Sequence, residues 1–186
     1  AAVRSMSDAC QWLDAPIISG NVSFYNETRD QNVTPTPSTG LVGLRDSVTG
    51  IPVDCFQGEG QHVWRLSWHG VWCEGYATEI ATGGQHFSGQ IEAFEASAFV
   101  RLVREVVQQV QPKATRVVGK FGMGYTLARM CFGAKPVGMA VDAAVASETD
   151  TWLNERLYEV VLVVDSEMDL SPQLRPLIQS HPEIRE

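Results

Sequence analysis

The residues best suited to chemistry lie in one apolar run, Ile17-Ile18-Ser19-Gly20-Asn21-Val22-Ser23-Phe24-Tyr25. Asn21 carries an amide and Ser23 a hydroxyl, which are polar groups that could contact a ligand. The run is typical of a buried strand, in which a period of two places Asn21 and Ser23 on one face. Gly20 would let a ligand approach the backbone closely. The alternative is a buried strand whose polar groups are satisfied within the protein.

A second glycine-rich stretch, Gly119-Lys120-Phe121-Gly122-Met123-Gly124, precedes a predicted helix. Glycines at a helix N-terminus can expose backbone N–H groups to a phosphate. The stretch matches neither the Walker pattern nor the full dinucleotide fingerprint. A tight strand-to-helix turn explains the same glycines without any ligand, so both interpretations stay open.

Cysteine and histidine offer little further chemistry. No cysteine pair has CxxC spacing or a histidine at ligand spacing, so neither a zinc site nor a disulfide framework is expected. No histidine has an acidic or nucleophilic partner nearby in the sequence, so surface or core positions are expected rather than general-base catalysis. These residues are Cys10, Cys55, Cys73, Cys131, His62, His69, His86 and His181.

The elements that position these residues follow from hydrophobic periodicity. Helices are predicted at residues 3–13, 74–80, 91–110 and 122–131, and the first of them suggests that the chain begins within a domain. Strands are predicted at residues 16–25, 41–44, 63–68, 115–118, 137–141 and 157–164, and the last is expected to be central and covered on both faces. A loop is expected at residues 26–40, and a last helix with Ser171 as N-cap. The alternation indicates an α/β or α+β layer fold.

Composition narrows the function. A formal net charge of −8 and 44% hydrophobic residues indicate a globular protein without the clustered positive surface that nucleic acid requires. The longest apolar stretches are far short of a membrane span, and no signal-peptide pattern opens the chain. We therefore expect a cytoplasmic protein that binds neither nucleic acid nor membrane.

Residues 15–28, followed by Pro35-Thr36-Pro37 and Gly40-Leu41-Val42-Gly43, resemble a signature of formylglycinamide ribonucleotide amidotransferases. Altered copies of further motifs follow in order, at Gly58-Glu59-Gly60-Gln61 and Cys73-Glu74-Gly75-Tyr76. The resemblance covers nearly the whole chain and is most specific in residues 15–43. It implies an α+β protein from the carboxy-terminal portion of the synthetase. Residues 1–44 would end an AIR-synthase-like ATP-binding subdomain, and residues 45–186 would form an AIR-synthase-like carboxy-terminal α/β layer domain.

The resemblance also implies an activity. Such enzymes are ligases of purine biosynthesis that use ATP to convert formylglycinamide ribonucleotide to an amidine, with ammonia from a glutaminase subunit or domain. Carried onto the matched motif, Gly20 would bind ATP, Asn21 would ligate Mg²⁺ and Ser23 would bind the formylglycinamide substrate. Asn26 and Glu27 could support the metal or only cap the loop. An upstream synthetase segment would complete the active site.

Two departures from the family pattern leave other functions open. The family commonly has an Asp-Val-Ser-Asp-Gly-Gly turn where this sequence has residues 118–125, and residues 154–156 only partly replace an acidic, serine-containing turn. A degenerate, non-catalytic domain with a structural or assembly role is therefore the main alternative. Another synthetase of the same ATP-binding superfamily is a third.

Overall fold

The computed structural model describes residues 2–23, 26–33, 36–68, 72–73, 87–88, 93–119, 121–143, 152, 157–165 and 169–180. The chain divides into two compact units, Ala1–Ser47 and Val48–Glu186. We call them unit 1 and unit 2. The identification of the two parts with an ATP-binding subdomain and a carboxy-terminal domain stays a prediction.

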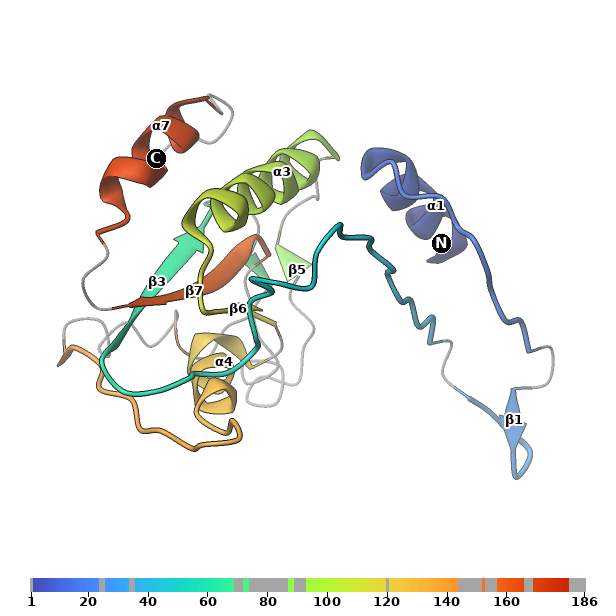
Figure 1. The fold of residues 1–186 in the computed structure, drawn as a ribbon. Coiled ribbons are helices and arrows are strands. Elements are labelled where there is room, and N and C mark those ends of the chain that lie inside the picture. Colours follow the sequence, from blue (N-terminus) through green and yellow to red (C-terminus); the bar gives the residue numbers. More distant parts are fainter. Residues whose placement is uncertain are drawn as a thin grey trace. The chain divides into compact units, whose positions relative to one another are not determined.

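Unit 1 contains a helix and a small hairpin (Figure 1). The predicted first helix is confirmed as α1 (Ala2–Trp12). Strands β1 (Glu27–Thr28) and β2 (Gln31–Asn32) pair antiparallel within the expected loop. Arg29 and Asp30 join them with φ values of 54° and 60°. Positive φ at both central residues is the geometry of the tight turn that suits the twist of a hairpin.

Two strands predicted in unit 1 are wrong. Residues 15–23 and 36–45 have no regular secondary structure, and their apolar side chains are exposed: Ile18 by 80%, Leu41 by 85% and Leu44 by 97%. A strand requires a neighbour to bond to, and within the described part of unit 1 β1 and β2 pair only with each other. An apolar run alone therefore did not produce a strand here.

Unit 2 is built on a three-stranded antiparallel sheet in the order β3-β7-β6. Its strands are β3 (Gln61–Ser67), β6 (Ala114–Val117) and β7 (Glu159–Asp165), which confirm the strands predicted at 63–68, 115–118 and 157–164. A separate antiparallel pair joins β4 (Trp72–Cys73) and β5 (Phe87–Ser88). The chain is thus a mixture of helices and sheet.

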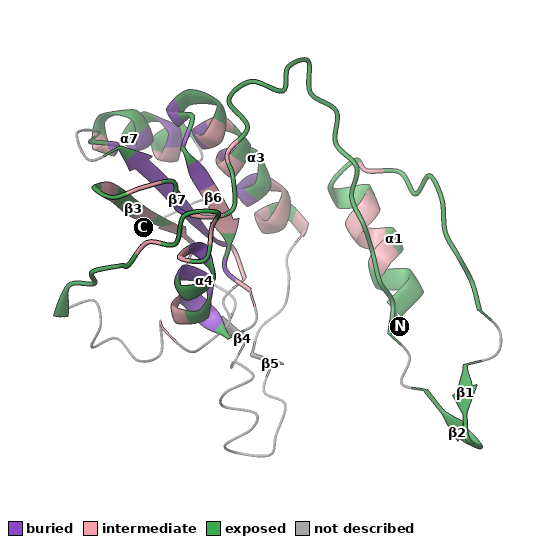
Figure 2. Ribbon diagram, turned by 60° about the horizontal axis from the view of Figure 1, so that its bottom comes forward, coloured by how far each residue is buried: buried purple, intermediate pink, exposed green. Residues whose placement is uncertain are grey.

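Helices pack on both faces of the sheet. The helices are α3 (Ala93–Val110), α4 (Gly122–Met130) and α7 (Ser171–Ser180), and α3 and α4 confirm the predicted helices. Val160, Leu162 and Val164 of β7 pack with α3 and α7, whereas Val161 and Val163 pack with α4. Since successive strand residues point to opposite faces, the β-branched run of β7 serves two cores at once (Figure 2).

Of three further predicted elements, one is absent, one has a different capping residue and one is not described. Residues 137–141 form no strand; the chain turns after α4, where the Val137 N–H donates to the Cys131 carbonyl oxygen at 3.2 Å. The last helix begins at Ser171, but Asp169 Oδ1 accepts its N–H at 2.9 Å, so the capping group is Asp169 and not the Ser171 hydroxyl. The predicted helix at 74–80 lies outside the described residues.

Candidate functional site

The predicted ligand residues Gly20, Asn21 and Ser23 lie on an exposed segment of unit 1 that follows α1. A Cβ added at Gly20 would meet nothing within 4 Å, so the backbone is open on that side. The structure therefore leaves these groups available to a ligand. The shared strand face predicted for Asn21 and Ser23 is absent, because the segment is not a strand.

Asn26 organises the end of this segment. Its Nδ2 donates to the Ser23 carbonyl oxygen at 2.9 Å, and its own carbonyl oxygen accepts the Val33 N–H at 2.8 Å. These bonds close the base of the hairpin, as Asn side chains commonly do at turns. Of the two roles considered for Asn26, the structural one has the geometric support.

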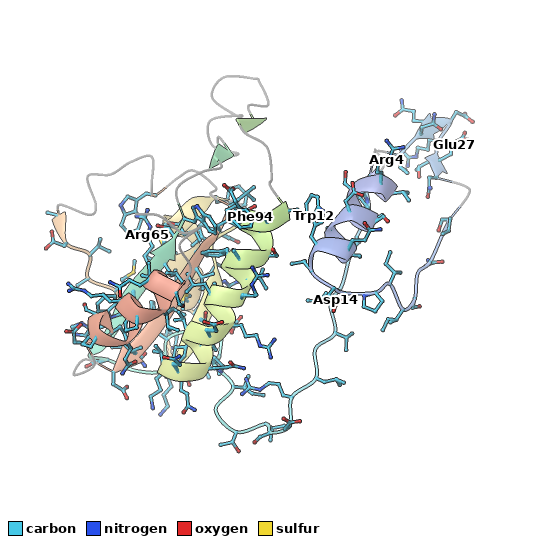
Figure 3. All side chains as sticks on the ribbon, turned by 90° about the horizontal axis from the view of Figure 1, so that it is seen from above. Arg4, Trp12, Asp14, Glu27, Arg65 and Phe94 are labelled. Carbon is cyan, nitrogen blue, oxygen red and sulfur yellow. The ribbon has the colours of Figure 1, made fainter. Side chains whose placement is uncertain are left out.

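The donor set of the segment fits one part of a magnesium site. Mg²⁺ usually retains waters and takes one or two protein oxygens together with substrate phosphates. Asn21 offers such an oxygen, and Glu27, which Figure 3 labels on β1, offers a carboxylate in the same unit. Across the described ranges, no group of three or more His, Cys, Asp or Glu residues is arranged to hold a metal ion. Any magnesium held here would therefore depend on phosphate oxygens and water.

Sequence reasoning missed a buried ion pair in unit 2. Arg65 Nε of β3 lies 2.6 Å from Glu159 Oε1 of β7, and the Glu159 side chain is completely buried while that of Arg65 is 30% exposed. Both residues lie on the sheet face that packs with α4, because Arg65 is opposite Val161 in the register. A glutamate opening an otherwise apolar strand was the only signal in the sequence. The pair ties the edge strand to the central strand.

The glycine-rich turn before α4 is explained by packing. Phe121 and Gly122 have φ values of 70° and 72°, and the Gly122 N–H donates to the Gly119 carbonyl oxygen at 3.0 Å. A Cβ on Gly124 would come within 3.0 Å of the Trp152 ring and 3.2 Å of its carbonyl oxygen. These features support the tight-turn interpretation over the phosphate cradle. Lys120 lies outside the described residues.

A hollow of about 440 Å³ lies at the start of β3. It is lined by two short segments, residues 58–63 with Phe56 and residues 137–140. The exposed His62 is one of its lining residues; the other three histidines lie outside the described part of the chain. None of the helices that the structure describes is long and apolar enough to cross a bilayer.

Known proteins show what the chain resembles. It is 28% identical over 151 residues to the phosphoribosylformylglycinamidine synthase subunit PurL of Helicobacter hepaticus, a match that covers 78% of this chain and 20% of that protein. It is 29% identical over 143 residues to PurL of Rhodopseudomonas palustris strain TIE-1, covering 76% of this chain and 19% of that protein. Over 61 residues, a third of the chain and 8% of the relative, identity to PurL of R. palustris strain HaA2 reaches 48%.

These relatives confirm the resemblance inferred from residues 15–43 and the later motifs. The chain spans about a fifth of the length of the PurL proteins that it matches over most of its own length. No protein-family model matches it.

Proposed function

Because the chain is related in sequence to part of the PurL subunits of phosphoribosylformylglycinamidine synthase, we propose that it acts in purine biosynthesis as part of that synthetase. The reaction is the ATP-dependent, glutamine-using conversion of formylglycinamide ribonucleotide to the amidine. It forms a C–N bond and makes the protein a ligase of the cytoplasm. The observation that carries the proposal is sequence similarity over more than three quarters of the chain.

The roles proposed within unit 1 follow the chemistry of each residue. Gly20 admits the nucleotide to the backbone, Asn21 donates its amide oxygen to Mg²⁺, and Ser23 hydrogen-bonds the formylglycinamide. The metal, when bound, neutralises charge on the phosphates of ATP, which is the main requirement of phosphoryl transfer. The exposure of all three residues supports this proposal, since each can be reached from outside.

Completion of the site by other parts of the enzyme belongs to the same proposal. Every described residue of unit 1 is exposed or only partly buried, so the unit provides no closed cavity of its own. An upstream synthetase segment would supply the remaining walls, and a glutaminase would deliver ammonia. The AIR-synthase-like assignment of residues 1–44 and 45–186 is part of this proposal. Titration of the isolated chain with magnesium and ATP should accordingly release no measurable heat.

Replacement of Asn21 tests the proposal. In the complete enzyme, Asn21→Ala should reduce ATP-dependent amidine formation by a hundredfold or more, because a positioning contact of several kcal/mol is lost. Asn32→Ala is the matched control, since Asn32 is also an exposed asparagine of unit 1. Wild-type turnover by the Asn21 variant would show that the assignment is wrong.

A non-catalytic, structural role remains the second candidate. It is favoured by the sequence of residues 118–125, which lacks the acidic residues of the family pattern. In that case substitutions at Gly20, Asn21 and Ser23 would all leave purine-independent growth unchanged. Deletion of unit 2 would nevertheless prevent assembly of the complex, as size-exclusion chromatography would show.

A further inference from the structure

The outer edge of β3 offers a docking position for another strand. β3 is at the end of the sheet order β3-β7-β6, and β7 is its only partner among the strands that the structure describes. In an antiparallel pair, alternate residues direct their N–H and C=O groups away from the partner strand. Such an edge can accept a further strand.

Residues 138–141, which we call the strap, run beside this edge. The hollow at the start of β3 has residues 58–63 on one side and residues 137–140 on the other, and Figure 1 shows the segment after α4 passing near β3. The strap is tethered at its start, since the Val137 N–H is bonded to the Cys131 carbonyl oxygen and Val137 packs against the core beneath α4. It therefore stays near the edge without being paired to it.

Residues 137–141, which comprise the strap and the residue before it, have the alternating pattern of a strand with one apolar face. Val137, Met139 and Val141 alternate with Gly138 and Ala140, and the structure leaves Met139 and Val141 exposed by 37% and 36%. Pairing with β3 would cover these two side chains and Val63, and it would satisfy backbone groups on both segments. The free energy gained by pairing must exceed the conformational entropy lost when four residues become ordered. A tethered segment loses less of this entropy than a free one.

We propose that the strap closes on β3 as a fourth strand, and that the hollow is the open state of this device. When the strap pairs with β3, it fills the hollow and shields the backbone groups of the sheet edge from solvent. When the strap separates from β3, the hollow and the edge are both exposed. The inference rests on the geometry of unit 2 alone and does not depend on the proposed enzymatic function.

Proline substitution combined with hydrogen exchange tests the strap. Successive residues of a strand point their N–H groups to opposite sides, so only one of Met139 and Ala140 can donate to β3. In one of the two variants, Met139→Pro or Ala140→Pro, the edge amides of β3 should exchange at least tenfold faster than in the wild type. The other variant should resemble the wild type.

Amides of β7 serve as the control, because that strand is buried and should remain protected in every variant that folds. Met139→Ala keeps the N–H and should retain the protection of β3. Equal effects of the two proline variants, or wild-type strap amides that exchange as fast as an unfolded peptide, would overturn the proposal. Failure of the proposed function at Asn21 would leave these exchange rates unchanged.

Discussion

The two units carry different kinds of information. Unit 1 contains the residues that we propose to bind ligands, yet none of its described residues is buried. Unit 2 contains two packed clusters on the faces of one sheet, yet its glycine-rich turn lacks the acidic residues of the family pattern. A sequence motif can therefore resemble that of a known family without forming a strand of its own, whereas the core of unit 2 follows from buried apolar side chains.

Truncation of a core side chain should give the largest difference between the units. Leu162 is completely buried at the centre of β7, and Leu162→Ala should lower the free energy of unfolding by about 2–5 kcal/mol through lost burial and a cavity. Ile18→Ala in unit 1 removes a side chain that is 80% exposed, and it should change the free energy of unfolding by less than about 0.5 kcal/mol. Urea denaturation followed by circular dichroism measures both. A large loss from the Ile18 variant would show that unit 1 shares the cooperative core.

Removal of one partner of the buried ion pair should have the next largest effect. Arg65→Met leaves the fully buried Glu159 carboxylate without this guanidinium, and breaking such pairs typically costs about 3 kcal/mol or more. The double variant Arg65→Met, Glu159→Gln should recover much of this loss, since no buried charge remains. If the single and double variants were equally unstable, the packing of Arg65 and not its charge would be responsible.

A smaller effect is expected at the turn before α4. Gly124→Ala places a Cβ 3.0 Å from the Trp152 ring and 3.2 Å from the Trp152 carbonyl oxygen. The variant should therefore lower the free energy of unfolding by about 1–3 kcal/mol. Gly119→Ala is the matched control, because a Cβ there meets nothing within 4 Å. Thermal unfolding of the two variants distinguishes them, and equal stability would contradict the packing explanation of the turn.

The smallest effect should come from the cap of α7. Asp169 accepts the Ser171 backbone N–H, and this bond, with the Ser171 hydroxyl and then the charge of Arg175, holds the pKa of the Asp169 carboxyl below its ordinary value. A depressed pKa stabilises the fold above the ordinary value of about 4, and the contribution is lost as pH falls through the lowered pKa. In low salt, Asp169→Asn should therefore slightly reduce the fall in the free energy of unfolding as the pH is lowered. An unchanged slope between about pH 4 and pH 2 would contradict it.

Unit 2 was largely predictable because its signals are local. The helical spacing of Ala98, Leu102 and Val106 predicts α3, and the β-branched run ending at Val164 predicts a central strand. The strands predicted at 16–25 and 41–44 depended on a neighbour that the sequence cannot reveal. The pairing of Arg65 with Glu159 was hidden for a similar reason, since the register of two distant strands brings them together. For the ligand residues the family motif was the sole guide, and their roles stay predictions.

Unit 1 should also differ from unit 2 in its susceptibility to proteases. Arg45 lies in an exposed stretch of unit 1 that has no regular secondary structure, which is the kind of backbone that proteases prefer. Brief trypsin treatment should therefore cut after Arg45 and release a product that begins at Asp46 and contains unit 2.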